Sequence, residues 1–438
     1  MLTINKNIQS EVMMMTMEDL VPETSIFRKI DAHIDFTFIY EAVEDLYCLD
    51  NGRPSLDPVV LFKLVFIQAL DGLKSMRKTC EKIHVDAEYR WFLNIPFGQD
   101  TPHFSTFSKN YERRFQGTDI FETIFINIVQ QAMAYGLVSG ETLFTDSTHK
   151  KANANKNKFE TQVVESVKKR RLWLEAEINE ERLRQGRKPF DYQDEVVHKT
   201  IKVSSVDQES GYYHRSHKEE GFMYLDHRTV DGKCNIIVDA HITKGNVHDS
   251  QPYIERLEAI QRNFNFKIKE VALDSGYDSL DIKKYLEAQS IFGVIGYRRY
   301  GSKASRAYRR QFKYDDDHDY FIDRKTGEVL EYRGLIDRHG YKKYQNVEKD
   351  ITLLRHLHED ISIRYDKNRL SEAGKSLYKR RKETIERSFA DSKQNHGYRY
   401  AMIRGIEKNQ AYTWLICAAQ NMKNIAIKRC KVNEFKIS

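Results

Sequence analysis

Two carboxylates occupy equivalent positions in the sequence, each at the end of a short apolar run. Asp146 closes the run in LFTDST and Asp274 closes the run in VALDSGYDS, and small polar residues follow both. Functional groups of α/β proteins collect where the strands of the sheet end. If the two strands are neighbours, the carboxylates lie side by side and repel each other unless a cation sits between them. Oxygen ligands of this kind suit Mg²⁺, or Mn²⁺ in its place.

A third carboxylate, Glu386, stands in the helical segment RRKETIERSFADSKQ. Helical spacing places Lys382 one turn before it and Lys393 two turns after it on the same face. Three carboxylates can hold two ions around a phosphodiester, where the ions activate the attacking oxygen and stabilise the leaving one. Two simpler interpretations stay open: Asp146 and Asp274 as turn or N-cap residues, and Glu386 in an exposed ion pair with Lys382.

Positive charge surrounds these acids. Asp146 is followed by THKKANANK, in which Lys150 and Lys151 are expected to form a rim that contacts phosphates. Around Glu386, the predicted contacts to a phosphate backbone are Lys382, Arg387 and Lys393.

The elements that must position the acids lie in residues 137–430, which we predict to form one α/β domain with a mixed sheet. The segment GFMYLDHRTVDGKCNIIVDAHIT predicts a hairpin with its turn at Asp231-Gly232. Helix, strand, helix and strand follow, and one long helix is expected over GKSLYKRRKETIERSFADSKQ. Two insertions are expected: an exposed, highly charged helix at about 157–190 and a β-rich segment at about 300–370.

Residues 1–136 predict an all-α domain. In DPVVLFKLVFIQALDGL, Asp57 is the expected N-cap and Pro58 the first helical residue. Arg77, Arg113 and Arg114 lie outside the apolar stripes of later helices and are candidate contacts to DNA. A helical packing domain with solvated charges is the equally favoured alternative.

Composition narrows the class of protein. The chain has 438 residues, 40% of them apolar, and a formal net charge of +7, which fits a folded protein with a nucleic-acid partner. Its five cysteines form no C-x-x-C pair, which argues against a disulfide framework or a zinc ribbon. No phosphate-binding glycine motif is present. The sequence shows no signal peptide and no apolar run long enough to span a membrane, so a cytoplasmic protein is expected.

Four ordered blocks resemble the catalytic segments of bacterial insertion-sequence DDE transposases, with the IS-eleven-eighty-two type as the branch that they resemble most. Segments RPSLDPVVLFKLVFIQAL and SMRKTCEKIHVDAEYRWFLNIP are similar to the helical N-terminal domain of the same proteins. The blocks are LFTDSTHKKANANK, GFMYLDHRTVDGKCNIIVDAHITKGNVHDS, VALDSGYDS and RRKETIERSFADSKQNHGYRYAMIRG.

The resemblance implies an RNase H-like catalytic domain with Asp146, Asp274 and Glu386 as its metal-binding triad. It implies Mg²⁺-dependent DNA cleavage at terminal inverted repeats, joining of the 3′-OH ends to target DNA, at least a dimer in the active complex, and a place of action at the bacterial nucleoid. A transposase-derived protein that only binds DNA and an RNase H-fold nuclease are the alternatives.

The sequence departs from the family pattern at two places. The family signature Y-x2-R-x3-E-x6-K keeps Glu386 and Lys393, but lysines stand at its Tyr and Arg positions, and Tyr378 and Arg381 keep the Y-x2-R spacing one residue earlier. The cysteine cluster that many members carry before the last acid is absent from the shortened segment RHGYKKYQNVEKDITLLRHLHED.

Overall fold

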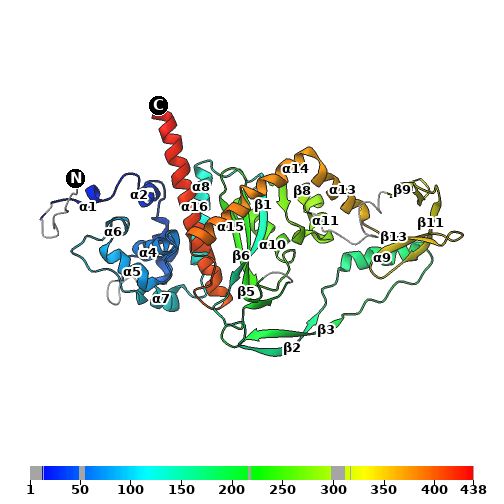
Figure 1. Ribbon diagram of the computed structural model, residues 1–438, viewed down its shortest axis with the longest axis horizontal. Coiled ribbons are helices and arrows are strands. Elements are labelled where there is room, and N and C mark those ends of the chain that lie inside the picture. Colours follow the sequence, from blue (N-terminus) through cyan, green and yellow to red (C-terminus); the bar gives the residue numbers. More distant parts are fainter. Residues whose placement is uncertain are drawn as a thin grey trace, which may run out of the picture.

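The computed structural model describes residues 12, 14–48, 55–215, 219–296, 311–315 and 317–437. Three parts follow one another along its long axis: a group of N-terminal helices, a central sheet with its helices, and a smaller sheet at the far end (Figure 1). Residues 297–310 of the predicted second insertion lie outside the described residues.

The N-terminal part is helical, as predicted. Its α4 begins as the sequence indicates, because the Asp57 side chain accepts hydrogen bonds from the N–H groups of Val59 and Val60, and Pro58 needs no such partner. The helices are α1 (Met17–Leu20), α2 (Ile26–Asp31), α3 (Phe38–Val43), α4 (Pro58–Leu70), α5 (Met76–Val85), α6 (Ala87–Leu93), α7 (Ser105–Asn110) and α8 (Ile120–Ala134).

The central sheet has the strand order and directions of an RNase H-like fold, which confirms the predicted fold class. Strands β6, β5 and β1 are antiparallel neighbours, β7 and β8 then continue parallel to β1, and β4 pairs with the start of β5. The strands are β1 (Thr142–Lys151), β4 (Gly211–Tyr213), β5 (Gly221–Asp231), β6 (Ile237–Lys244), β7 (Glu270–Leu273) and β8 (Phe292–Ile295), with α10 (Tyr253–Phe264) before β7 and α11 (Leu280–Ala288) before β8.

The helix predicted over GKSLYKRRKETIERSFADSKQ is broken in two, so that prediction was wrong in its continuity. The segment forms α14 (Glu372–Lys379), a short 3₁₀ turn (Arg380–Lys382) and α15 (Ile385–Asn395), and it follows α13 (Glu359–Leu370). Thr384, at the break, has φ −113° and ψ −95°, far from helical values. The break gives the Arg381 and Glu386 side chains directions that one continuous helix would not give them.

The first insertion differs from its prediction. Residues 159–167, expected to be helical, form β2 (Phe159–Val167), which pairs with β3 (Val196–Ser204); only α9 (Leu172–Arg184) is helical. Both edges and both faces of this two-stranded ribbon are largely exposed. Val163, Val164 and Val167 suit a strand better than a helix, and their β preference outweighs the charged pattern that favoured a helix.

The second insertion is β-rich, as predicted. It forms an antiparallel sheet in sequence order, and the turn after Lys325 joins its second and third strands. Leu174 and Ile178 of α9 pack against Ile336 of this sheet, so the two insertions contact each other. The strands are β9 (Phe312–Asp315), β10 (Tyr320–Asp323), β11 (Val329–Ile336), β12 (Tyr341–Asn346) and β13 (Ile351–His356).

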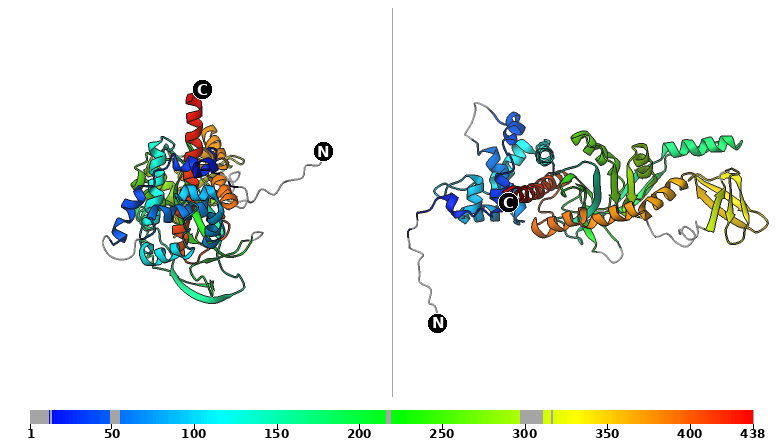
Figure 2. Two further views of the ribbon diagram at one scale, coloured as in Figure 1. Left: turned by 90° about the vertical axis from the view of Figure 1, so that its left-hand side faces the viewer. Right: turned by 90° about the horizontal axis from the view of Figure 1, so that it is seen from above.

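One hydrophobic core joins the N-terminal helices to the central sheet. The last helix, α16 (Ile406–Ile437), packs against α2, α4, α8 and β6, and it lies between the two parts (Figure 2). Phe62 and Ile128 of the helices share this core with Val238 of the sheet and Ile416 of α16. The predicted boundary between residues 136 and 137 therefore separates the helical part from the part with the sheet. The two parts nevertheless share one hydrophobic core.

Candidate active site

Asp146 and Asp274 are neighbours in the sheet. Strands β1 and β7 run parallel, and the last paired residues are Thr145 and Leu273, directly before the two aspartates. Asp274 then caps a short 3₁₀ turn (Ser275–Tyr277) by accepting the N–H of Gly276. The two carboxylates thus stand at the same height on adjacent strands, about 5 Å apart at the backbone.

β1 does not end at Asp146, which corrects one expectation. Pairing with β7 stops at Thr145, but pairing with β5 continues from Asp146 to Lys151. Asp146 therefore lies where β1 loses its parallel neighbour and keeps its antiparallel one.

The environment of Asp146 favours its neutral form. Burial raises the pKa of the Asp146 carboxyl to about 6; the guanidinium of Arg381 opposes this rise, and the charges of Asp274 and Asp249 add to it. The N–H of Ser147 donates to Oδ1 of Asp146 at 2.9 Å. A carboxylate held in this way gains stability when a further cation approaches.

Arg381 is the cation that the structure places on Asp146. Its Nη2 donates to Oδ2 of Asp146 at 2.7 Å, its Nη1 contacts the hydroxyl of Tyr378 at 3.3 Å, and its side chain is buried. Tyr378 and Arg381, whose spacing matches the signature one residue early, therefore lie together at the site, whereas Lys382 is exposed. The turn between α14 and α15 turns Arg381 toward the sheet.

Glu386 lies in the first turn of α15 and is exposed. Its helix is fixed to the sheet beside the acids, because Nζ of Lys393 donates to Oγ1 of Thr148 on β1 and Arg228 of β5 donates to Ser388 and Ser392. Within the described residues, no group of three or more acidic, histidine or cysteine side chains is already arranged to hold a metal ion. The structure thus brings two of the three predicted acids together and places the third on the adjacent helix.

Lys150 contradicts its predicted contact with DNA. Its side chain is fully buried, its Nζ donates to Oδ1 of Asn409 at 3.0 Å, and the rings of Tyr398 and Tyr412 lie 4.5 and 5.1 Å from it. Burial lowers the pKa of Lys150 to about 7. A group enclosed in this way cannot reach a phosphate, because β1 continues through it instead of opening into a loop.

The other cations predicted to contact DNA lie at the surface. Lys151 is half-buried and paired with Glu219, while Arg387 is exposed. In the N-terminal helices, Arg77 is exposed and lies over the ring of Phe104. Arg113 and Arg114 line a polar hollow beside α7, together with Lys109, His103, Ser105, Thr106 and Asn110.

Asp249 also lies at this site, although it is not among the acids predicted from the sequence. It follows β6 in NVHDSQPY, and its Oδ1 accepts the hydroxyl of Ser147 at 2.6 Å. The sequence shows that Asp249 follows the predicted hairpin. It does not show that the loop carrying Asp249 returns to β1.

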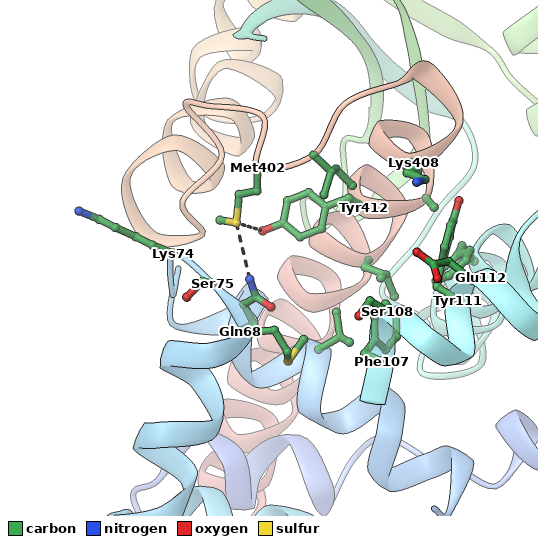
Figure 3. A pocket seen from close by; sticks show the side chains of 16 residues that line it. Gln68, Lys74, Ser75, Phe107, Ser108, Tyr111, Glu112, Met402, Lys408 and Tyr412 are labelled. Carbon is green, nitrogen blue, oxygen red and sulfur yellow. Dashed lines mark hydrogen bonds between the residues drawn. The ribbon is translucent and has the colours of Figure 1, made fainter. Parts of the chain in front are cut away.

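A separate apolar cavity of about 370 Å³ lies between the N-terminal helices and α16, away from the acids. Gln68 of α4 and Tyr412 of α16 both contact the sulfur of Met402 at its edge (Figure 3). The cavity is lined mainly by apolar side chains such as Val65, Phe107 and Phe121, and no pair of carboxylates among the described residues faces it. It therefore separates packed helices and does not extend the acidic site.

Two family models match the chain. Residues 15–113 match a model described as "Transposase domain (DUF772)", and residues 341–426, which include Glu386 and Lys393, match one described as "Transposase DDE domain". The chain belongs to the DDE transposases of insertion sequences. Neither match covers Asp146 or Asp274, and neither distinguishes the type of insertion sequence.

Other comparisons add little to this identification of the transposase. No curated protein matches. A solved structure, the cryo-EM structure of piggyBac transposase synaptic complex with hairpin DNA, matches with a TM-score of 0.35 and 8% identity over 92% of this chain and 74% of that one, a similarity too low to support an argument. Within its described residues, the transposase has no helix long and apolar enough to cross a membrane.

The family implies a divalent metal ion, and the residues at the acidic site fit one. Asp146 and Asp274 offer hard oxygen atoms from adjacent strands, and burial keeps the pKa of Asp146 raised although Arg381 lowers it.

Proposed function

We propose that this transposase cuts DNA at the terminal inverted repeats of its insertion sequence and joins the 3′-OH ends to target DNA. Asp146, Asp274 and Glu386 are the proposed catalytic and metal-binding residues, with Mg²⁺ as the natural ion and Mn²⁺ as its substitute. The observation that supports this proposal best is the pair Asp146 and Asp274 at adjacent strand positions, because two repelling carboxylates are costly to keep without a cationic ligand.

A bound divalent ion would supply Lewis-acid activation of the attacking oxygen and stabilise the leaving oxygen. Asp146 and Asp274 would hold it from the sheet, and Glu386 would complete the set from α15. Both cleavage and joining are in-line displacements at phosphorus, so one arrangement of carboxylates serves both steps.

The cations have proposed roles in holding DNA. Lys393 reaches β1 beside the acids, and Lys382 and Arg387 are exposed on either side of Glu386, so these three can follow a phosphate backbone past the site. Lys151 at the end of β1 and Arg77, Arg113 and Arg114 in the N-terminal helices are more distant contacts in the same proposal. Two transposon ends must be handled together, so a homodimer is the proposed active form.

One observation favours a second candidate, a transposase-derived protein that binds DNA and does not cut it. Arg381 already forms an ion pair with Asp146, and Glu386 stands exposed outside any described group of acids. A guanidinium in this place can serve the catalytic protein by contacting phosphate, or it can block a metal ion permanently.

Cleavage of labelled DNA distinguishes the candidates. The DNA carries the ends that flank the reading frame, and it is incubated with the full chain and Mg²⁺ or Mn²⁺. Asp146→Asn, Asp274→Asn and Glu386→Gln should each lower cleavage by at least about 10³-fold, as expected when a group that stabilises the transition state is removed. Cleavage that survives Asp146→Asn would overturn the proposal; binding without cleavage by the unaltered protein would favour the second candidate; and cleavage without joining would indicate a nuclease.

A further inference from the structure

We propose that Asp249 is a fourth carboxylate of the active centre, a positioning residue whose negative charge strengthens divalent-cation binding at Asp146 and Asp274. This inference rests on the proposed function, since it concerns the same centre. It adds an acid from the loop between β6 and α10, on the opposite side of the aspartate pair from Arg381 and α15.

The first observation is the contact between Asp249 and β1. Oδ1 of Asp249 accepts the hydroxyl of Ser147, the residue that follows Asp146, at 2.6 Å. The bond holds the loop after β6 against the strand that carries Asp146. Oδ2 of Asp249 lies toward Gly276, in the turn that follows β7.

The second observation is the glycine that Asp249 shares with Asp274. A Cβ added to Gly276 would overlap with Oδ2 of Asp249 and lie 2.8 Å from Oδ1 of Asp274. The backbone of Gly276 does not need the left-handed region, so a residue with a side chain is excluded here by the two carboxylates alone. Both acids therefore lie against the same small residue, close enough to act on one cation.

The third observation is a buried hydroxyl within electrostatic reach of the same acids. The side chain of Tyr277 is 1% exposed, and its hydroxyl has no hydrogen-bond partner among the described residues. Burial raises the pKa of Tyr277 above its ordinary value, and the charges of Asp249, Asp146 and Asp274 raise it further, so this hydroxyl lies within the field of all three acids. A buried hydroxyl without a partner is costly, so a polar ligand bound near the three acids would relieve part of this cost.

Charge balance gives Asp249 its role. Three carboxylates lie within electrostatic reach of one another, and Arg381 is the cation paired with Asp146. Two negative charges therefore remain on these three acids before Glu386 is counted, an excess that favours binding of a divalent cation. Since the described acids do not already form a three-ligand shell, we assign Asp249 to the field around the ion and to the placement of β1, not to direct ligation.

The alternative is a purely structural loop contact, and two variants separate it from the proposal. Asp249→Asn keeps an oxygen that accepts the Ser147 hydroxyl but removes the charge, whereas Ser147→Ala removes the hydrogen bond and keeps the charge. Glu255→Gln, an exposed position on α10, is the matched control for loss of one negative charge.

The readout is Mn²⁺ affinity of the full-length, DNA-free protein, measured by isothermal titration, with thermal melting as the test of folding. Asp249→Asn should weaken Mn²⁺ binding about 10-fold, Ser147→Ala less than about 3-fold, and Glu255→Gln not at all, as one charge near the ion requires. If the Asn variant melts early, Asp249→Ser replaces it, because serine is smaller and keeps a hydroxyl.

Unchanged Mn²⁺ affinity in Asp249→Asn, or an equal loss in Ser147→Ala, would overturn this inference. If Asp146→Asn and Asp274→Asn still weaken binding, the proposed metal centre stands and only the role of Asp249 fails. If these two variants bind Mn²⁺ as the unaltered protein does, or if that protein binds none, the metal centre itself and this inference with it are overturned.

Discussion

Two groups of buried charge lie four residues apart along β1, and they are built in opposite ways. At Asp146, carboxylates gather and Arg381 pairs with one of them. At Lys150, cations gather instead: Arg228 lies beside it, and Asp226 is the acid that pairs with Arg228 at 2.7 Å, both fully buried. Burial raises the pKa of Asp146 to about 6 and lowers the pKa of Lys150 to about 7. In both cases burial disfavours the charged form, the carboxylate of Asp146 and the ammonium of Lys150.

The difference lies in what each centre contacts. Arg228 stands opposite Asp146 in the β1–β5 register, yet it turns to Asp226 and to Ser388, Ser392 and Gln420. It thereby ties α15 and α16 to the sheet and leaves Asp146 to Arg381. The centre around Arg228 and Asp226 joins the helices α15 and α16 to the sheet. The centre around Asp146 and Asp274 has an excess of negative charge. The Arg228–Asp226 ion pair balances its own charge, although Nε of Arg228 and Oδ1 of Asp226 have no hydrogen-bond partner among the described residues.

The largest expected effect comes from removing the buried ion pair between Arg228 and Asp226. Arg228→Met should lower the free energy of unfolding by about 3–5 kcal/mol, because it leaves Asp226 buried without its partner. Urea unfolding of the full chain measures this. Lys78→Met, at an exposed ion pair with Glu81, is the control and should cost less than about 1 kcal/mol. Equal losses at the two sites would mean that the buried pair has no special structural role.

At the acidic centre, removing charge should instead stabilise the fold, because the buried negative charge of Asp146 lowers the free energy of unfolding. The pKa of Asp146 is higher in the folded chain than in the unfolded one, so the folded state binds more protons between about pH 4 and pH 6. The contribution of Asp146 to stability should therefore fall over this range as pH rises, by on the order of 2–3 kcal/mol. Asp146→Asn should abolish that fall, and Mn²⁺ should restore stability above pH 6 in the unaltered protein only. Urea unfolding across pH tests this, and an identical pH profile in the variant would contradict it.

A smaller effect should follow from crowding the acids without changing charge. Gly276→Ala places a methyl group against Asp249 and Asp274, and overpacking of this kind costs about 1–3 kcal/mol. Mn²⁺ affinity should fall with it, because the two carboxylates are pushed apart. Gly98→Ala, where an added Cβ meets nothing within 4 Å, is the matched control. Thermal melting and Mn²⁺ titration measure both variants; a Gly276→Ala protein that behaves like the control would show that the acids have room to move.

Sequence reasoning succeeded where local pattern and strand order suffice. The hairpin around Asp231-Gly232 and the start of α4 at Asp57 were predictable, because turn chemistry and capping act within a few residues. The RNase H-like order was implied by the family resemblance, and the nearness of Asp146 to Asp274 was predicted on the condition that their strands are neighbours, which β1 and β7 are. The environment of Lys150 was not predictable, because it comes from Tyr398, Asn409 and Tyr412, more than two hundred residues away in the chain. The same holds for Asp249, whose loop must return to β1 before its contact exists, and for the break at Thr384, where tertiary packing overrides helix propensity.

The smallest expected effect concerns two cations of the N-terminal helices, Arg113 and Arg114, which belong to neither buried centre. Arg113 is exposed beside α7, whereas Arg114 also packs over the ring of Tyr47 at 4.4 Å. If both contact phosphates, Arg113→Ala should reduce the slope of log affinity against log salt by about 1 with no change in stability. Arg114→Ala should reduce the slope equally and also lower the melting temperature by a few degrees, since it loses packing as well as charge. Fluorescence anisotropy with end DNA between 50 and 200 mM salt measures the slopes. An unchanged slope in both variants would confine DNA binding to the cations around the acidic centre and leave the helices as a packing domain.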